Sequence, residues 1–146
     1  MKPAARKVLF LCTGNSARSQ MAEALLQLEA ARRPAGASPM EACSAGTAPK
    51  GVHPLTIAAL AELGVDWRAA RSKHIEEFLP SPPDLVISVC DNAKESCPTF
   101  PARVERLHWP FEDPAAAAGS DAQRLAVFRR VRDEIRTRIQ QWISMK

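Results

Sequence analysis

A strand, a cysteine-containing loop and a helix follow one another near the start of this chain. Residues 8–11 are four consecutive apolar residues, the pattern of a short strand buried on both faces of a parallel sheet. Residues 21–28 place apolar side chains on one stripe of a helix. The loop between them, residues 12–19, reads CTGNSARS and holds a thiol at the tip of the strand. A strand that passes through a short loop into a helix favours an α/β architecture.

This loop has the composition of an anion-binding site. Backbone N–H groups in a loop of small residues point into the turn, and the helix that follows adds partial positive charge. Arg18 can hold two oxygens of a tetrahedral oxyanion, and its charge favours the nucleophilic thiolate form of Cys12. The spacing Cys-x5-Arg therefore predicts a loop that binds an oxyanion and attacks its central atom, with a buried cysteine beside a surface arginine as the alternative. The expected substrate-binding residues are Thr13, Gly14, Asn15, Ser16, Ala17, Arg18 and Ser19.

The rest of the chain alternates strands with helices. We expect strands over 40–46, 84–90 and 104–109, a helix that starts at Pro54, a helical turn over 75–79, and a last helix after Ser120 with a capping box to Gln123. This order predicts one α/β domain over residues 1–146. It has about four parallel strands connected by right-handed crossovers, with helices on both faces of the sheet.

Three polar segments follow the predicted strand ends. Cys12, Cys90 and the pair Glu112–Asp113 come just after the first, third and fourth strands. Because parallel sheets bind ligands at the carboxyl ends of their strands, these segments are expected to meet at one edge. Asp113 precedes a proline there and is the candidate acid for a departing oxygen, with the neighbouring Glu112 as the alternative.

Cys90 and Cys97 are separated by six residues, a spacing that argues against a zinc pair, where about two to four residues intervene. On a regular helix, positions seven apart lie about 10 Å apart along the axis, whereas a disulfide needs α-carbons within about 7 Å. The pair can therefore form a disulfide only if the segment is a loop or unwinds, and Pro98 marks where a helix would end. We interpret the pair as a redox relay, with two unrelated thiols as the alternative.

Charge and composition limit the kinds of molecule that this protein is expected to bind. The net charge of +4 suits an anionic substrate; it would also suit nucleic acid, but the chain has no tyrosine and its basic residues are mixed with acidic ones. No apolar run approaches the roughly 20 residues of a membrane span, and no secretion signal is visible, so we expect a cytoplasmic protein that binds neither membrane nor nucleic acid. Cys43, inside a predicted strand, is expected to be a buried thiol without chemistry.

The whole pattern resembles the thioredoxin-coupled arsenate reductases built on the low-molecular-weight protein tyrosine phosphatase fold, which is flavodoxin-like. The resemblance spans nearly the whole chain. It is most evident in residues 12–23, 44–46, 90–97 and 108–114. The anion loop alone fits phosphatases and reductases equally. The pair Cys90 and Cys97 makes the resemblance to the reductases more specific.

The resemblance implies a mechanism. Arsenate binds to Arg18 and the loop, Cys12 attacks arsenic, and Asp113 protonates the leaving oxygen. Cys90 then attacks Cys12, which releases arsenite and leaves a Cys12–Cys90 disulfide. Cys97 attacks Cys90, and thioredoxin reduces the resulting Cys90–Cys97 disulfide. No tightly bound cofactor is needed, and we expect a monomer.

The resemblance also concerns the surroundings of the loop. Ser19 matches a family residue that hydrogen-bonds within the loop and supports the thiolate. Some members of the family bind potassium beside the loop, and Asn15, Glu23 and Ser44 match that site. Asp66 is our choice for the remaining ligand, and its match is the weakest of the four.

Three other functions fit part of the sequence. A phosphatase on the same fold needs only Cys12, Arg18 and Asp113, although this chain has Ala115 where tyrosine phosphatases carry a tyrosine, so Trp109 or Phe111 would have to wall the substrate ring. A reductase supplied by glutaredoxin or mycothiol would not need Cys97. A thiol sensor or metal-binding module would use Cys90, Cys97 and His108 and leaves the anion loop unexplained.

Overall fold

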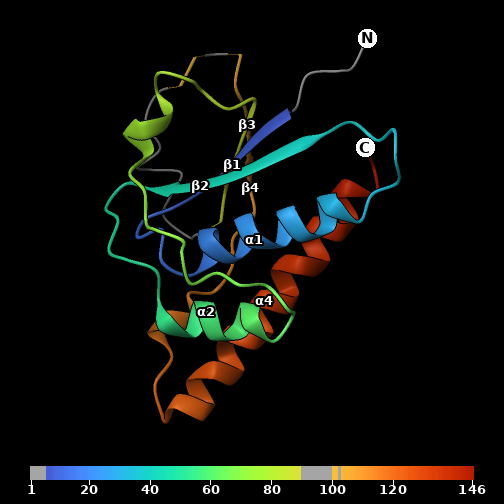
Figure 1. The fold of residues 1–146 in the computed structure, drawn as a ribbon. Helices are drawn as coiled ribbons and strands as arrows, with labels where there is room; N and C mark the ends of the chain where they lie inside the picture. Colours follow the sequence, from blue (N-terminus) through green and yellow to red (C-terminus); the bar gives the residue numbers. More distant parts are fainter. Residues whose placement is uncertain (1–5, 90–99, 102) are drawn as a thin grey trace.

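A computed structural model of the chain describes residues 6–89, 100–101 and 103–146 (Figure 1). Its strands are β1 (Arg6–Cys12), β2 (Met40–Gly46), β3 (Leu85–Ser88) and β4 (Glu105–His108). Its helices are α1 (Arg18–Ala31), α2 (Pro54–Ala61) and α4 (Asp121–Ile143), with the short 3-10 helices η1 (Ile75–Phe78) and η2 (Pro114–Ala116). No helix among these described residues is both long and apolar enough to cross a membrane.

The four strands form one parallel sheet in the order β2-β1-β3-β4, which confirms the predicted sheet. Residues 8–11 of β1 are fully buried, because this strand lies in the interior of the sheet and has a covered surface on each side. β4 forms an edge, and its four residues are exposed. The strand predicted over 84–90 is shorter in the structure, and Cys90 lies outside the described residues.

The two faces of the sheet are covered by different kinds of helix. The Phe10 ring of β1 contacts Trp109, with centroids 6.3 Å apart, and Trp109 contacts Trp142 of α4 edge to face. Lys7 Nζ lies 5.3 Å from the centre of the Phe78 ring in η1. Because strand side chains alternate, Lys7 and Phe10 point to opposite faces, so α4 lies over one face and η1 over the other.

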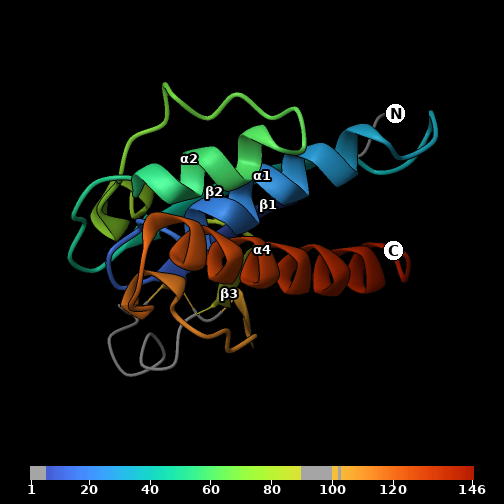
Figure 2. The ribbon, with the colours of Figure 1, turned by 90° about the horizontal axis from the view of Figure 1, so that it is seen from below.

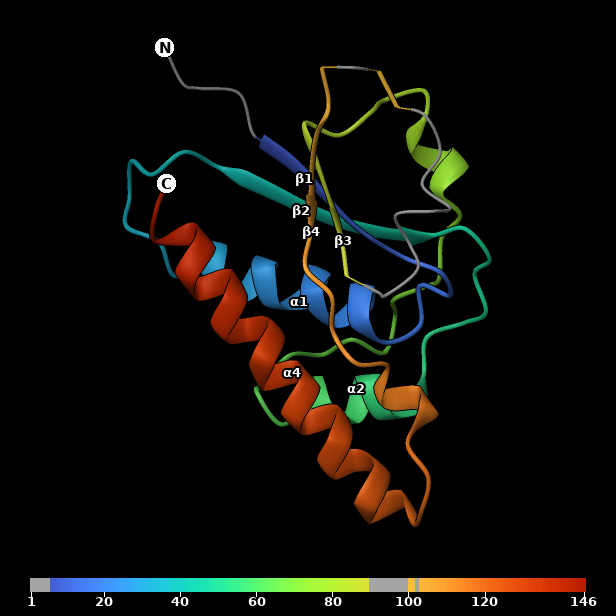
Figure 3. The ribbon, with the colours of Figure 1, turned by 180° about the vertical axis from the view of Figure 1, so that it is seen from behind.

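The helices α1, α2 and α4 gather on a single face. α1 packs on α4 and α2, and α2 also packs on α4 (Figure 2). Viewed from behind, η1 lies on the far side of β1 and β2 from these helices (Figure 3). Among the described residues, both faces of the sheet therefore carry a helix, as expected, with α1, α2 and α4 on one side and the short 3-10 helix η1 on the other.

The helices α2 and α4 begin where the sequence predicted. His53 caps α2 by accepting a hydrogen bond from the Leu55 N–H, with Pro54 in the first turn. Ser120 and Gln123 form the predicted capping box at the start of α4. α1 is different: it starts at Arg18 directly after the cysteine loop and has no side-chain cap. Its free N–H groups therefore face the loop.

An ion cluster fastens α2 to α4. Arg132 of α4 is buried, and its NH1 donates to Ala59 O at 2.8 Å and to Glu62 Oε1 at 2.7 Å. Arg129 donates to the same carboxylate at 2.6 and 2.9 Å. The hydrogen bonds from Arg129 have the largest effect, and together with those from Arg132 they lower the pKa of Glu62 to about 2. The charged Glu62 carboxylate therefore connects the end of α2 to two arginines of α4.

Candidate active site

The cysteine loop lies at the carboxyl end of β1 and lines a cavity of about 340 Å³. Cys12 is the last residue of β1 and Arg18 is the first residue of α1. The lining residues are Cys12, Thr13, Gly14, Ser16, Ala17, Arg18, Ala48, Lys50, Asp113 and Ala115. The cavity thus brings together a thiol, a guanidinium and a carboxylate from three predicted site residues.

A series of hydrogen bonds joins the ends of the strands around this cavity. The Val89 N–H donates to Leu11 O at 2.9 Å, and the Phe111 N–H donates to Val89 O at 3.3 Å. Arg18 NH1 in turn donates to Phe111 O at 3.1 Å. The residues that follow β1, β3 and β4 therefore meet at one edge of the sheet, as the strand pattern predicted. Cys90, the residue after Val89, lies outside the described residues.

Cys12 is buried and has a serine partner. Its Sγ lies 2.9 Å from Ser19 Oγ, and Asn15 Nδ2 lies 2.8 Å from the same oxygen. Because the Asn15 amide nitrogen is a donor, Ser19 accepts from it and keeps its own hydrogen for the sulfur. The contact is therefore suited to a thiolate, which accepts hydrogen bonds and does not donate them.

Asn15 organises the back of the loop. Its backbone has a φ of 45°, in the left-handed region that asparagine tolerates better than most residues. Its side chain is fully buried, and Oδ1 accepts from the Lys73 N–H at 2.8 Å and from Gln20 Nε2 at 2.9 Å. Ser72 Oγ donates to the Asn15 carbonyl oxygen at 2.6 Å. The loop is thus held from behind by α1 and by the segment that precedes η1.

The two candidate acids have different surroundings. Asp113 Oδ2 lies 3.7 Å from Arg18 NH2, and the other carboxylate oxygen accepts from the Ala115 N–H at 3.0 Å. Glu112, by contrast, forms an ion pair with Arg130 at 3.0 Å and is 59% exposed. Asp113 borders the cavity, and Glu112 is not among the residues that line it.

Glycine is required at position 46 because the end of β2 and the cysteine loop approach each other closely there. A Cβ at this position would collide with Thr13 O and would lie 2.9 Å from Asn15 N and 3.0 Å from Cys12 O. The end of β2 therefore packs directly against the backbone of the loop. The strand pattern predicted a strand end here, but nothing in it predicted the contact.

The sequence analysis did not identify several other residues that shape the cavity. Lys50 and Ala48 line it, and the Lys50 side chain lies over Gly14. The His53 N–H donates to Ser16 O at 3.1 Å, and burial, helped by Arg124, lowers the pKa of the His53 imidazole. These residues come from the segment after β2, which carries no recognisable motif, so only the fold assigns them to the site.

The residues chosen for a potassium site do not fit that ion. Asn15 turns its amide nitrogen, a donor, toward Ser44 Oγ at 2.9 Å. Glu23 Oε1 already faces an ammonium group, Lys73 Nζ, at 3.5 Å. Asp66 is on the surface, where it binds the Arg68 guanidinium through two hydrogen bonds of 2.9 Å. A potassium ion needs oxygen ligands around it, and this set instead supplies hydrogen-bond donors and a cation.

The other cysteines divide into two groups. Cys43 is a buried free thiol in β2 that donates to Val8 O, and burial raises its pKa to about 12, which favours the thiol over the nucleophilic thiolate. Cys90 and Cys97 lie outside the described residues, and their pairing stays a prediction. Among the described residues, no group of three or more His, Cys, Asp or Glu side chains is placed to hold a metal ion.

A family comparison agrees with this geometry. The family of low molecular weight phosphotyrosine protein phosphatases matches residues 7–145. The chain belongs to this family. Among its relatives is a protein of Halalkalibacterium halodurans named arsenate reductase, 44% identical over 132 residues, which are 90% of this chain and 91% of the relative.

Solved structures of arsenate reductases have the same fold. An arsenate reductase in its phosphate-binding state matches with a TM-score of 0.73 and 33% identity, over 96% of this chain and 98% of that one. A thioredoxin-dependent arsenate reductase of Corynebacterium glutamicum matches with a TM-score of 0.71 and 29% identity, over 99% of this chain and 63% of that one.

Proposed function

We propose that this protein is an arsenate reductase that acts through Cys12, Cys90 and Cys97 and receives its electrons from thioredoxin. The observation that carries the proposal is the arrangement of Cys12, Arg18 and Asp113 around one small cavity. The cysteine pair at positions 90 and 97 supplies the two further thiols that a reductase needs and a phosphatase does not. The names of the relatives support the same reaction, and the Corynebacterium glutamicum structure supports thioredoxin as the donor.

The shape of the cavity favours a small oxyanion over an aryl phosphate. Among the described residues, those that line it include no aromatic side chain. Trp109, a candidate wall for a phosphotyrosine ring, is 4% exposed and packs between Phe10 and Trp142. The lining that the structure describes therefore offers a small oxyanion the loop N–H groups and the guanidinium, and offers no aromatic surface to a phosphotyrosine ring.

The first step is nucleophilic attack on arsenic. Arsenate binds to the Arg18 guanidinium and the loop N–H groups, and the Cys12 thiolate forms a sulfur–arsenic bond. One arsenic–oxygen bond breaks, and Asp113 donates the proton with which the oxygen leaves as water. Ser19 donates its hydrogen bond to the thiolate before the attack.

The second step transfers two electrons. Cys90 attacks Cys12 Sγ, the electron pair of the sulfur–arsenic bond goes to arsenic, and arsenite leaves while the two thiols become a disulfide. Cys97 then attacks Cys90 and frees Cys12, and the dithiol of thioredoxin reduces the Cys90–Cys97 disulfide. The backbone contact of Val89 with Leu11 supports this proposal, since these residues precede Cys90 and Cys12.

Arsenate-dependent NADPH consumption in the presence of thioredoxin and thioredoxin reductase tests the proposal. The native chain is expected to turn over, whereas Cys12→Ser and Cys97→Ser are expected to lose turnover. Unchanged turnover in Cys97→Ser would mean that thioredoxin reduces the Cys12–Cys90 disulfide directly, and it would contradict the role of Cys97. No turnover in the native chain, together with hydrolysis of an aryl phosphate, would contradict the reductase and leave a phosphatase.

A further inference from the structure

Lys50 lies on the segment after β2 and lines the active-site cavity. Its backbone N–H donates to Gly14 O at 3.1 Å, which fixes the residue against the cysteine loop. A Cβ built on Gly14 would lie 2.7 Å from Lys50 Cε and 3.1 Å from Lys50 Cγ, so the lysine stem runs across the bare Cα of this glycine. Because Nζ is bonded to Cε, the ammonium also lies next to the loop. The cavity therefore has a cation besides Arg18, which borders it from the start of α1.

The thiolate and a doubly charged oxyanion together carry more negative charge than Arg18 alone can balance. Arg18 supplies a single positive charge, and its guanidinium already contacts Phe111 O at 3.1 Å and Asp113 Oδ2 at 3.7 Å. The N–H groups of the loop and of the first turn of α1 add only partial charges. A further cation at the cavity therefore lowers the electrostatic cost of placing a doubly charged anion beside the Cys12 thiolate.

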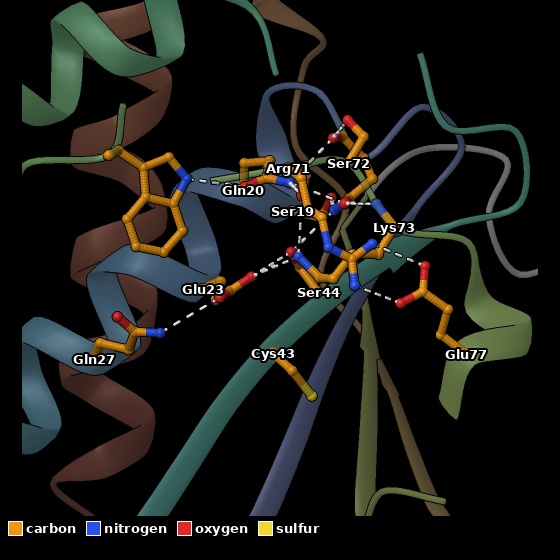
Figure 4. Close-up of polar contacts among 12 residues, drawn as sticks. Ser19, Gln20, Glu23, Gln27, Cys43, Ser44, Arg71, Ser72, Lys73 and Glu77 are labelled. Carbon is orange, nitrogen blue, oxygen red and sulfur yellow. Dashed lines mark hydrogen bonds and ion pairs between the residues drawn. The ribbon is translucent and has the colours of Figure 1, made fainter. Parts of the chain in front are cut away.

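Two other basic side chains near the loop are unsuited to this task. Lys73 lies behind the loop, where its ammonium is 3.5 Å from Glu23 Oε1 (Figure 4). His53 caps α2, and burial, helped by Arg124, lowers the pKa of its imidazole, so it is uncharged at neutral pH. Lys50 differs from both, because it is exposed and no carboxylate of the described residues forms an ion pair with it. Its charge is therefore available to an anion in the cavity.

We propose that Lys50 is a substrate-binding residue that favours doubly charged over singly charged oxyanions at Cys12. Arg18 holds the oxygens through directed hydrogen bonds, whereas the Lys50 ammonium acts as a point charge whose attraction is proportional to the charge of the anion. The inference rests on the proposed function, because the doubly charged form of arsenate is then the form that Cys12 attacks. It requires an oxyanion at Cys12, but it does not require the later disulfide steps.

Binding of inorganic phosphate tests the role of Lys50 without arsenate turnover. Phosphate protects Cys12 from iodoacetamide, and mass spectrometry of the peptide that contains Cys12 gives the dissociation constant. At about pH 8, where phosphate is mostly doubly charged, Lys50→Gln is expected to bind it about tenfold more weakly than the native chain. At about pH 6, where it is mostly singly charged, the expected loss is only about threefold, because the attraction is halved.

Two further variants separate the charge at the cavity from packing and from net charge. Lys50→Arg keeps the positive charge and is expected to bind phosphate within about threefold of the native chain. Lys7→Gln is the matched control, since it removes the same charge from β1 five residues before Cys12, about 16 Å along the strand. It is expected to bind phosphate like the native chain at both pH values. With arsenate, Lys50→Gln is expected to raise KM about tenfold and to leave kcat nearly unchanged.

Three results would overturn the inference. They are native phosphate binding in Lys50→Gln, a loss of binding that is equal at the two pH values, or the same loss in Lys50→Arg or Lys7→Gln. If phosphate binding follows the expected pattern but no arsenate is turned over, the role of Lys50 stands and the proposed function fails. If arsenate is turned over and Lys50→Gln binds phosphate like the native chain, the proposed function stands and the inference fails.

Discussion

Ser19 Oγ lies 2.9 Å from Cys12 Sγ and joins the first turn of α1 to the tip of β1. Asn15 Nδ2 donates to the same serine oxygen, so the serine hydrogen is directed at the sulfur. The loop therefore contributes a hydrogen-bond donor to Cys12 in addition to the backbone N–H groups that face the cavity. This donor acts on the nucleophile, whereas Arg18 acts on the oxyanion.

Replacing Ser19 with alanine is expected to weaken the nucleophile without unfolding the chain. Loss of one hydrogen bond to a charged group predicts a decrease of about 10- to 100-fold in kcat/KM for arsenate and in the alkylation rate of Cys12. Ser144→Ala, at the end of α4, is the control and is expected to be native-like. Native rates in Ser19→Ala would show that the contact does not support the thiolate.

Asp113→Asn and Glu112→Gln distinguish the two candidate acids. Asp113 borders the cavity, so Asp113→Asn is expected to lower kcat by about 10²- to 10⁴-fold with a smaller effect on KM. Asparagine retains an oxygen for the Ala115 N–H, so the start of η2 is preserved. Glu112→Gln loses only a surface ion pair with Arg130 and is expected to keep native turnover. The opposite result would assign the proton to Glu112.

Gly46→Ala is expected to damage the loop and the stability together. The new methyl group would collide with Thr13 O, and the nearby backbone of Cys12 and Asn15 leaves it no space. Gly36→Ala is the matched control: it strains a residue with φ +93°, but nothing lies within 4 Å of its Cβ position. Arsenate turnover and thermal melting of both variants check this. Full activity in Gly46→Ala would mean that the loop tolerates a displacement of β2.

Glu62→Gln tests the link between charge and stability at the α2–α4 contact. The folded pKa of Glu62, about 2, lies below its ordinary value of 4.5, so the charged carboxylate contributes stability above pH 4.5, and this contribution is lost as the pH falls toward 2. The variant is expected to melt below the native chain at neutral pH, and the difference should narrow over that acidic range. Glu134→Gln, which removes an exposed ion pair, is the control. A difference independent of pH would contradict the assignment.

The local pattern of the sequence predicted the frame of the site. The apolar run at 8–11 and the capping box at Ser120 both depend on short-range rules, and the structure has both of them. The meeting of Arg18 with the segment before Asp113 followed from the parallel order of the strands. Short-range patterns in the sequence were enough to predict these features.

The contacts that hold the cysteine loop from behind could not be predicted from the sequence. Asn15 and Lys73 are 58 residues apart, and the Lys73 segment lies in a stretch without regular periodicity. The choice of Asp66 as an ion ligand overlooked Arg68, two residues away, which binds its carboxylate. The distribution of helices also depends on packing, since only the fold shows that α1, α2 and α4 lie on one face. Tertiary contacts, and not local preference, decide such features.

Disulfide mapping of Cys97→Ser after one exposure to arsenate tests the relay most directly. Each chain is expected to release one arsenite and to stop with Cys12 and Cys90 joined in a disulfide, because the thiol that would free Cys12 is missing. The native chain, treated in the same way without thioredoxin, is expected to end with Cys90 and Cys97 joined. A Cys97→Ser chain that releases arsenite with Cys90 still reduced, or that forms no disulfide at Cys12, would contradict the three-cysteine relay.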